Sequence, residues 1–309
     1  MQLCLTLNRA LWHQFRVVRV ISPSWVVGIG DSDEVNKLSL DEDDIEWIET
    51  YAKEVNEEFG REFEANRDRF ANGPLLLDRF RASIHTLLTH GRGYFRGVDE
   101  AHNELCIASA ILGSTSSPVS RLEYEPNLPG CAKTIDFRAI TSNDDCFYFD
   151  VKTVKPQPKD RWEQFEKAMH EDWFPENVRM GLFKEWRGGE TWHEWFASRS
   201  RMLEYTLELE QKISDADLIN SYTRSVLVLC GEGFVWHQSQ LEDFVTFYFR
   251  GLHRADDPFA LAEQKYMAEQ RLSFARTISR FACMKRRQGE VRHSRLNWNV
   301  QPPRDMFYV

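Results

Sequence analysis

The sequence has few cysteines and no long apolar run, and both absences narrow what the chain can be. Its six cysteines are widely scattered, with no CxxC pair and no histidine cluster at zinc-binding spacing. This argues against a structural zinc site and against a disulfide framework. No stretch approaches the roughly 18 uncharged apolar residues that a membrane span needs. We therefore expect buried, reduced thiols and no association with a membrane.

Signals for export and for repeats are also missing. The first residues, MQLCLTLNRALWHQF, lack the long apolar region and the small-residue cleavage site of a signal peptide, so we expect a cytoplasmic location. No internal repeat or low-complexity linker is visible. With 309 residues and 42% hydrophobic content, the chain can form one large domain, or a core domain with helical additions.

Basic residues are outnumbered by acidic ones, 39 to 48, and the charges of both signs are unevenly distributed. Residues 31–70 hold fifteen acids against five bases, a local charge of −10, so the rest of the chain carries about +1 of the net charge of −9. Residues 271–304 carry nine bases and one acid, so this basic tail could contact phosphate through Lys285, Arg286 and Arg287. The alternative is that both charged runs are solvated helix faces that pair with each other.

Apolar periodicity predicts helices in the first third of the chain. Ser39 and Glu42 form a capping-box pattern ahead of apolar residues at three-to-four spacing. We expect the acidic helix that follows, over 41–69, to offer a surface to a protein partner or to a second copy of the chain. The same reasoning predicts two further helices, over 74–88 and over 99–113, the latter capped by Asp99.

The periodicity then changes to short β-branched or aromatic runs separated by turn-rich segments. Three such runs are typical of a strand meander, and a fourth, uniformly apolar run predicts a central strand covered on both faces. Before the fourth run, a helical pattern predicts a crossover helix. The predicted strands are 119–124, 134–140, 146–154 and 225–230, and the predicted crossover helix is 198–214.

Five tryptophans fall within residues 161–196, between the third predicted strand and the crossover helix. They could stack nucleobases, but a small helical insertion over 156–197 that needs bulk for its own core accounts for them better. Helical patterns continue after the last predicted strand, over 240–249 and 260–281, and lead into the basic tail. The expected organisation is therefore a mainly helical region 1–97, a core 98–235, and a helical C-terminal region 236–309.

Aspartates occur where the second and third predicted strands should carry apolar residues. Asp136 lies in TIDFRAI, and strand alternation places Asp150 and Lys152 of CFYFDVKTV on one face. If Asp136 and Asp150 lie on the same face of the sheet, their side chains converge. Two adjacent carboxylates repel, and a divalent cation between them keeps both ionised at the least cost. Lys152 can then orient an attacking water or stabilise charge on a scissile phosphate.

This arrangement resembles the PD-(D/E)xK superfamily, the restriction-endonuclease-like nucleases. The family core is a helix, a three-stranded meander, a crossover helix and a further strand, in the order predicted here over 98–235. The resemblance implies an α/β (α+β) fold with a central mixed sheet of about four or more strands flanked by helices. It also implies a metal ligand on the first core helix, for which Glu104 in HNELCIASAILG is the candidate. The proline that precedes the family's first aspartate is Ile135 here.

The resemblance further implies a nuclease, an endonuclease by preference, that depends on Mg²⁺ or Mn²⁺ and acts on DNA rather than RNA. In this interpretation Asp136, Asp150 and Lys152 are catalytic, and Asp136, Asp150 and Glu104 bind the metal. The alternative is an inactive nuclease-fold protein with a binding or regulatory role, and a third possibility is an unrelated α/β protein in which these acids are dispersed.

Several residues near the motif have a second interpretation. Arg138 could contact phosphate or simply neutralise a neighbouring acid. Lys155 could extend a positive rim around the site or be an ordinary loop lysine. His102 is expected to be structural. Asp150 and Lys152 could themselves form a surface ion pair on an edge strand, which strands often carry.

Overall fold

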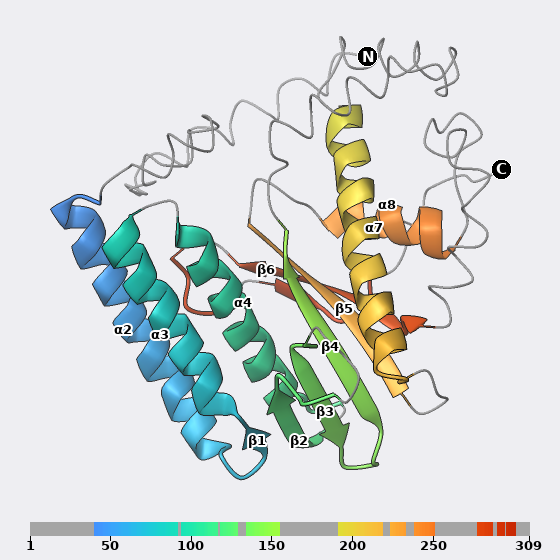
Figure 1. Ribbon diagram of the computed structural model, residues 1–309, viewed down its shortest axis with the longest axis horizontal. Coiled ribbons are helices and arrows are strands. Elements are labelled where there is room, and N and C mark those ends of the chain that lie inside the picture. Colours follow the sequence, from blue (N-terminus) through green and yellow to red (C-terminus); the bar gives the residue numbers. More distant parts are fainter. Residues whose placement is uncertain are drawn as a thin grey trace, which may run out of the picture.

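The computed structural model describes residues 40–91, 94–116, 118–128, 134–154, 191–218, 223–232, 238–250, 277–286, 289–293 and 295–300. Within them, a seven-stranded mixed sheet has its strands side by side in chain order (Figure 1). The strands are β1 (Phe70–Ala71), β2 (Val119–Tyr124), β3 (Phe137–Thr141), β4 (Cys146–Thr153), β5 (Thr223–Glu232), β6 (Arg280–Arg286) and β7 (Arg295–Asn297). The expected central mixed sheet flanked by helices is confirmed.

Strand directions divide the sheet into antiparallel and parallel parts. β3 runs antiparallel to both β2 and β4, whereas β4, β5 and β6 are parallel to one another, as are β1 and β2. β7 closes the far edge antiparallel to β6. Parallel neighbours cannot be joined by a tight turn, and the helix α7 (Thr191–Asp215) lies in the chain between β4 and β5.

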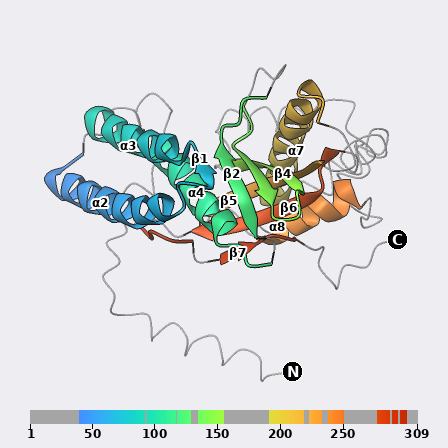
Figure 2. The same cartoon turned by 90° about the horizontal axis from the view of Figure 1, so that it is seen from below.

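Helices cover both faces of the sheet (Figures 1 and 2). One face packs against α2 (Glu42–Ala65), α3 (Gly73–His90) and α4 (Phe95–Leu112), and the other packs against α7, α8 (Gln238–Phe244) and the π-helical turn η3 (Val245–Phe249). β5 shows the alternation clearly, because Val226 and Val228 enter the first core and Leu227 and Leu229 the second. The prediction of a central strand covered on both faces is confirmed. Burying each such side chain contributes roughly 1.5–3 kcal/mol.

The start of α2 differs from the prediction. The capping box is formed by Asp41 and Asp44, with Asp44 N donating to Asp41 Oδ1 at 2.8 Å and Asp41 N donating to Asp44 Oδ2 at 3.3 Å. Glu42, the expected partner of Ser39, instead lies in the first turn, and Ser39 lies outside the described residues. An aspartate caps as well as a serine does, and acids in the first turn also interact favourably with the helix dipole.

The start of α4 also differs from the prediction. α4 begins at Phe95, so Asp99 is not its cap but a buried residue within the helix.

The C-terminal region is not uniformly helical, and this corrects the expected organisation. α8 and η3 account for the pattern over 240–249, but Arg280 and Phe281 belong to β6, which pairs with β5. The reason is visible in the alternation of β6, where Phe281 and Cys283 face one core and Ala282 and Met284 the other. Residues 251–276, which carry most of the second predicted helix, lie outside the described residues.

Two further expectations can be compared with the described residues. Cys106, Cys230 and Cys283 are free and buried, as expected. No helix in the described ranges is both long enough and apolar enough to cross a bilayer. Of the predicted tryptophan-rich insertion, residues 155–190 lie outside the described part, and Trp192 and Trp195 belong to the first turns of α7.

Candidate functional site

The pairing of β3 with β4 brings the two strand aspartates together. Phe137 is paired with Phe149, so Asp136, one residue before β3, lies level with Asp150. Asp136 Oδ2 accepts a hydrogen bond from Val151 N at 2.6 Å, which fixes its carboxyl group against β4. Burial and the negative charge of Asp150 together raise the pKa of Asp136 to about 7. The two carboxyl groups therefore interact, as the alternation predicted.

Asp150 is completely buried and lies between two lysines. Its Oδ1 accepts a hydrogen bond from Lys212 Nζ at 2.5 Å, and its Oδ2 lies 3.4 Å from Lys152 Nζ. Among the described residues, Oδ2 nevertheless has no hydrogen-bond partner. A buried carboxylate oxygen without a partner is costly, and most buried polar groups avoid this state. The carboxylate of Asp150 therefore retains capacity for a further ligand.

Lys152 is held in place by α7. Its Nζ donates to Glu208 Oε2 at 2.8 Å and lies 6.0 Å from the centre of the Tyr205 ring. Burial lowers the pKa of Lys152, but the charge of Asp150 and the contact with Glu208 outweigh it, and the pKa rises above its ordinary value. Lys152 is consequently a fixed cation at neutral pH rather than a proton acceptor.

Lys212 belongs to this site although the motif did not predict it. It projects from α7 with 6% of its surface exposed, beside the buried Leu209 and Ile213. A lysine at the border of an apolar helix face is the only signal in the sequence. That signal does not reveal its partner, because Asp150 lies 62 residues earlier.

Glu104 lies nearby but is held on the side of the sheet covered by α4. Its Oε2 is 2.5 Å from Arg79 Nη1 and accepts a hydrogen bond from the Tyr124 hydroxyl at 3.2 Å. Burial and the charge of Asp136 raise the pKa of Glu104 well above its ordinary value. Glu104 is thus a neighbour of Asp136, but its carboxylate is bound by Arg79 and Tyr124.

The described residues were also compared with the requirements of a metal centre. No three or more of their acids, histidines and cysteines are grouped so that they could hold a metal ion together. Asp136 and Asp150 do fit a hard divalent cation, because Asp150 Oδ2 has no hydrogen-bond partner and the charge of Asp150 raises the pKa of Asp136. The role of Glu104 as a third ligand stays a prediction.

Arg138 neutralises a neighbouring acid. Its Nε donates to Glu123 Oε2 at 2.6 Å, and Arg121 Nη2 contacts the other carboxylate oxygen of Glu123 at 2.7 Å. This is the second of the two interpretations suggested for Arg138. Its role as a phosphate contact stays a prediction.

Arg286, expected to contact nucleic acid, is instead a core residue with 1% of its surface exposed. Its Nη2 is 2.5 Å from Asp99 Oδ1, its Nε donates to Asn103 Oδ1 at 3.2 Å, and its Nη1 lies 3.4 Å from the Tyr51 hydroxyl. The expectation of a surface position is corrected because β6 inserts this side chain between α2 and α4. Lys285 is partly exposed, and Lys155 and Arg287 lie outside the described residues.

His102 belongs to the same buried network. Its Nδ1 contacts the Tyr51 hydroxyl and its Nε2 lies 2.8 Å from the carbonyl oxygen of Val291. Burial and the charge of Arg286 lower the pKa of His102 well below its ordinary value, so the ring is neutral. These contacts agree with the structural role expected for His102.

The acidic helix and the basic tail meet at Arg292. The Arg292 guanidinium is 2.9 Å from Glu58 Oε1 and 2.6 Å from Glu62 Oε2, and it lies 4.6 Å above the Phe59 ring. For this residue, the alternative that the two charged runs pair with each other is confirmed. Part of the acidic surface of α2 is consequently covered by the chain's own C-terminal region.

A scan against protein-family models and searches of curated proteins and of solved structures found no match. The geometry of the site is therefore the basis for assigning a function.

Proposed function

We propose that the protein is a nuclease that depends on Mg²⁺ or Mn²⁺ and acts on DNA. The observation that carries the proposal is the meeting of Asp136, Asp150 and Lys152 on neighbouring strands. An acid with a raised pKa, a buried acid with one oxygen that accepts no hydrogen bond from the described residues, and a fixed cation are together typical of a functional site. The preference for DNA, and for endonuclease activity, comes from the family resemblance alone.

The order of elements supports a restriction-endonuclease-like core. α4, the meander β2–β3–β4, α7 and β5 follow one another as the resemblance implies, and β5 lies parallel to β4. Asp136 lies one residue before the second strand of this meander, and Asp150 lies on the third.

The proposed chemistry assigns a separate task to each side chain. Asp136 and Asp150 would hold the divalent ion, which when bound supplies a Lewis acid and lowers the pKa of a coordinated water. Lys152 would place a permanent positive charge beside the scissile phosphate, where it stabilises negative charge that develops during hydrolysis. Glu208 orients Lys152, and Lys212 offsets the negative charge of Asp150.

One observation favours a second candidate, a nuclease-fold protein with a binding or regulatory role. Asp150, Lys152, Lys212 and Glu208 form a connected ion-pair network in which each charge has a partner of opposite sign. Such a network could be purely structural, since ion pairs of this kind also perturb pKa values.

Cleavage assays distinguish the two candidates. We expect the purified protein to cut DNA with Mg²⁺ or Mn²⁺ and not with EDTA, and Asp150→Asn to abolish cleavage. Single-stranded DNA, duplex DNA and RNA are tested side by side. Asp145→Asn is the matched control, because Asp145 is a partly exposed acid just before β4 that pairs with Arg224. This variant should leave cleavage unchanged. Metal-independent binding without cleavage of any substrate would favour the second candidate.

A further inference from the structure

A pocket with a strongly aromatic lining opens on the other face of β4, away from Asp150. The enclosed part of the pocket has a volume of about 110 Å³, and its mouth is open to solvent. Residues from the end of α4 and from β2 to β6 line it, together with Trp298 beyond β7. Strand alternation separates this pocket from the Asp136–Asp150 site, because Phe147 and Phe149 point opposite to Asp150.

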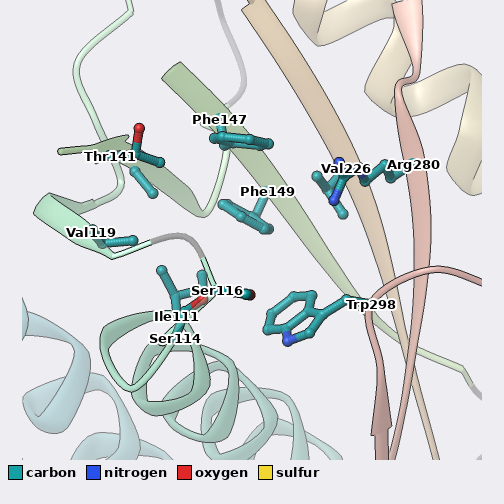
Figure 3. Close-up of a pocket in the computed structure, with 11 residues that line it drawn as sticks. Ile111, Ser114, Ser116, Val119, Thr141, Phe147, Phe149, Val226, Arg280 and Trp298 are labelled. Carbon is teal, nitrogen blue, oxygen red and sulfur yellow. The ribbon is translucent and has the colours of Figure 1, made fainter. Parts of the chain in front are cut away.

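Three aromatic rings give the pocket its character. Phe149 is buried at the centre, with its ring stacked on Phe147 at 6.2 Å and in edge contact with Trp298 at 5.9 Å. Phe147 and Trp298 are only half-buried, so part of each remains accessible to a ligand. Figure 3 shows these rings around a common space. Accessible aromatic rings of this kind bind flat, conjugated molecules, and stacking on a nucleobase is worth roughly 1–3 kcal/mol.

Positive charge and hydroxyl groups border the same space. Arg280, at the start of β6, is exposed and lines the pocket, and no carboxylate pairs with it in the described part of the chain. The guanidinium of Arg224 lies 5.3 Å above the Phe147 ring. Ser114 and Ser116 lie across the pocket from Arg280 (Figure 3). A matching ligand therefore has a flat ring for the aromatic side chains, a negatively charged group for Arg280, and polar atoms for the serine hydroxyls.

We propose that this pocket binds one nucleotide. Its base would pack against Phe147 and Trp298, its phosphate would meet Arg280, and Ser114 and Ser116 would form hydrogen bonds with its polar edge. A free mononucleotide and a nucleotide within a single strand share this chemistry. Because the pocket lies on the face of β4 opposite to Asp150 and Lys152, the inference does not rest on the proposed nuclease activity.

Calorimetric titration of the full chain in EDTA tests the proposal, with adenosine monophosphate, adenosine and inorganic phosphate as probes. We expect saturable binding of the monophosphate, binding of adenosine that is about threefold to tenfold weaker, and no measurable binding of phosphate alone. Arg280→Gln should reduce the affinity for the monophosphate to that for adenosine. Arg295→Gln, an exposed arginine of β7 outside the pocket, is the matched control and should change nothing.

Variants of the rings test the stacking. Trp298→Ala and Phe147→Leu should each weaken binding at least about fivefold. Trp298→Phe keeps a ring, and should retain most of the affinity even if Trp298→Ala does not fold. Asp150→Asn should bind the monophosphate normally.

Competition by a short single-stranded oligonucleotide separates the two sources of the ligand. If the oligonucleotide displaces the monophosphate, the pocket accepts a nucleotide within a strand; if it does not, the pocket takes the free nucleotide. Either result supports the proposal. Absence of saturable monophosphate binding, or binding that is insensitive to the Arg280 and Trp298 variants, would overturn it.

Discussion

Arg286 and Asp150 are both almost completely buried charges, with exposed fractions of 1% and 0%, and they lie on opposite faces of the sheet. Arg286 has an acid and two further polar partners around it. Asp150 has two lysines, but it also has the like charge of Asp136 beside it and an oxygen without a hydrogen bond. A buried charge that is fully hydrogen-bonded and paired with an opposite charge stabilises the fold. A buried charge that lies beside a like charge and has an oxygen without a hydrogen bond indicates a ligand-binding site.

Removing the charge of Arg286 should have the largest effect on stability. Arg286→Met leaves Asp99 buried without its partner, so we expect the free energy of unfolding to fall by about 3–5 kcal/mol. Chemical denaturation measures this loss. Adding Asp99→Asn should restore a substantial part of it, because the uncompensated charge is then gone. A loss below about 1 kcal/mol would mean that the network contributes little to the fold.

Lys152→Ala should act on catalysis instead. Under the proposed function, we expect single-turnover cleavage to fall about 100-fold or more, equivalent to about 2.7 kcal/mol of transition-state stabilisation. DNA binding measured in Ca²⁺ should barely change. Lys53→Ala, an exposed lysine on α2, serves as the control. Equal losses of binding and cleavage would show that Lys152 holds substrate rather than stabilising the reaction.

The raised pKa of Asp136 predicts a pH dependence of stability. Its carboxyl group titrates near 3.8 when unfolded and at about 7 in the folded protein. The folded state therefore binds this proton more tightly, so the contribution of Asp136 to stability is greatest below about pH 4 and declines as pH rises to about 7. Allowing for the partial exposure of Asp136, the change should be on the order of 2 kcal/mol.

The effect of Asp136 is isolated by comparing denaturation of the wild type with that of Asp136→Asn across this range. The difference between the two proteins should follow the predicted decline, and added Mg²⁺ should reduce it if the ion binds there. A difference that stays constant with pH would show that Asp136 does not titrate in this range.

Arg292→Gln should have the smallest effect. Its guanidinium is 39% exposed and pairs with Glu58 and Glu62, so we expect a loss of about 1 kcal/mol that shrinks at high salt. Arg61→Gln removes a more exposed pair with Glu58 and should cost less. Thermal melting at low and high salt measures both. A salt-independent loss for Arg292→Gln would point to its packing on Phe59 instead.

Local patterns were sufficient to predict much of the fold. The spacing of apolar residues predicted α2 and α3, and the alternating or uniformly apolar runs predicted β2 to β5 within a few residues of their ends. Asp136 and Asp150 could be brought together from sequence because they lie on adjacent strands joined by a short turn. The register of such a hairpin follows from its length and its apolar pattern.

Interactions between distant residues set the limit of prediction. β6 carries arginine and lysine among its apolar residues and so resembled a solvated helix, and the partner that allows Arg286 to be buried, Asp99, lies 187 residues earlier. Lys212 could not be assigned to the site for the same reason, because its partner Asp150 is distant in the sequence. β1 has only two residues, too few to show any period. In each case, tertiary contacts outweigh local sequence preference.

β4 also constrains how this sequence can change. Successive residues of the strand point to opposite faces of the sheet, with Phe149 in the aromatic pocket and Asp150 beside Lys212 of α7. Insertion or deletion of a single residue between Cys146 and Asp150 would exchange these faces, placing a carboxylate among aromatic rings and a phenyl ring between ammonium groups. Substitutions can adjust either face separately, but a change in length here would destroy both at once.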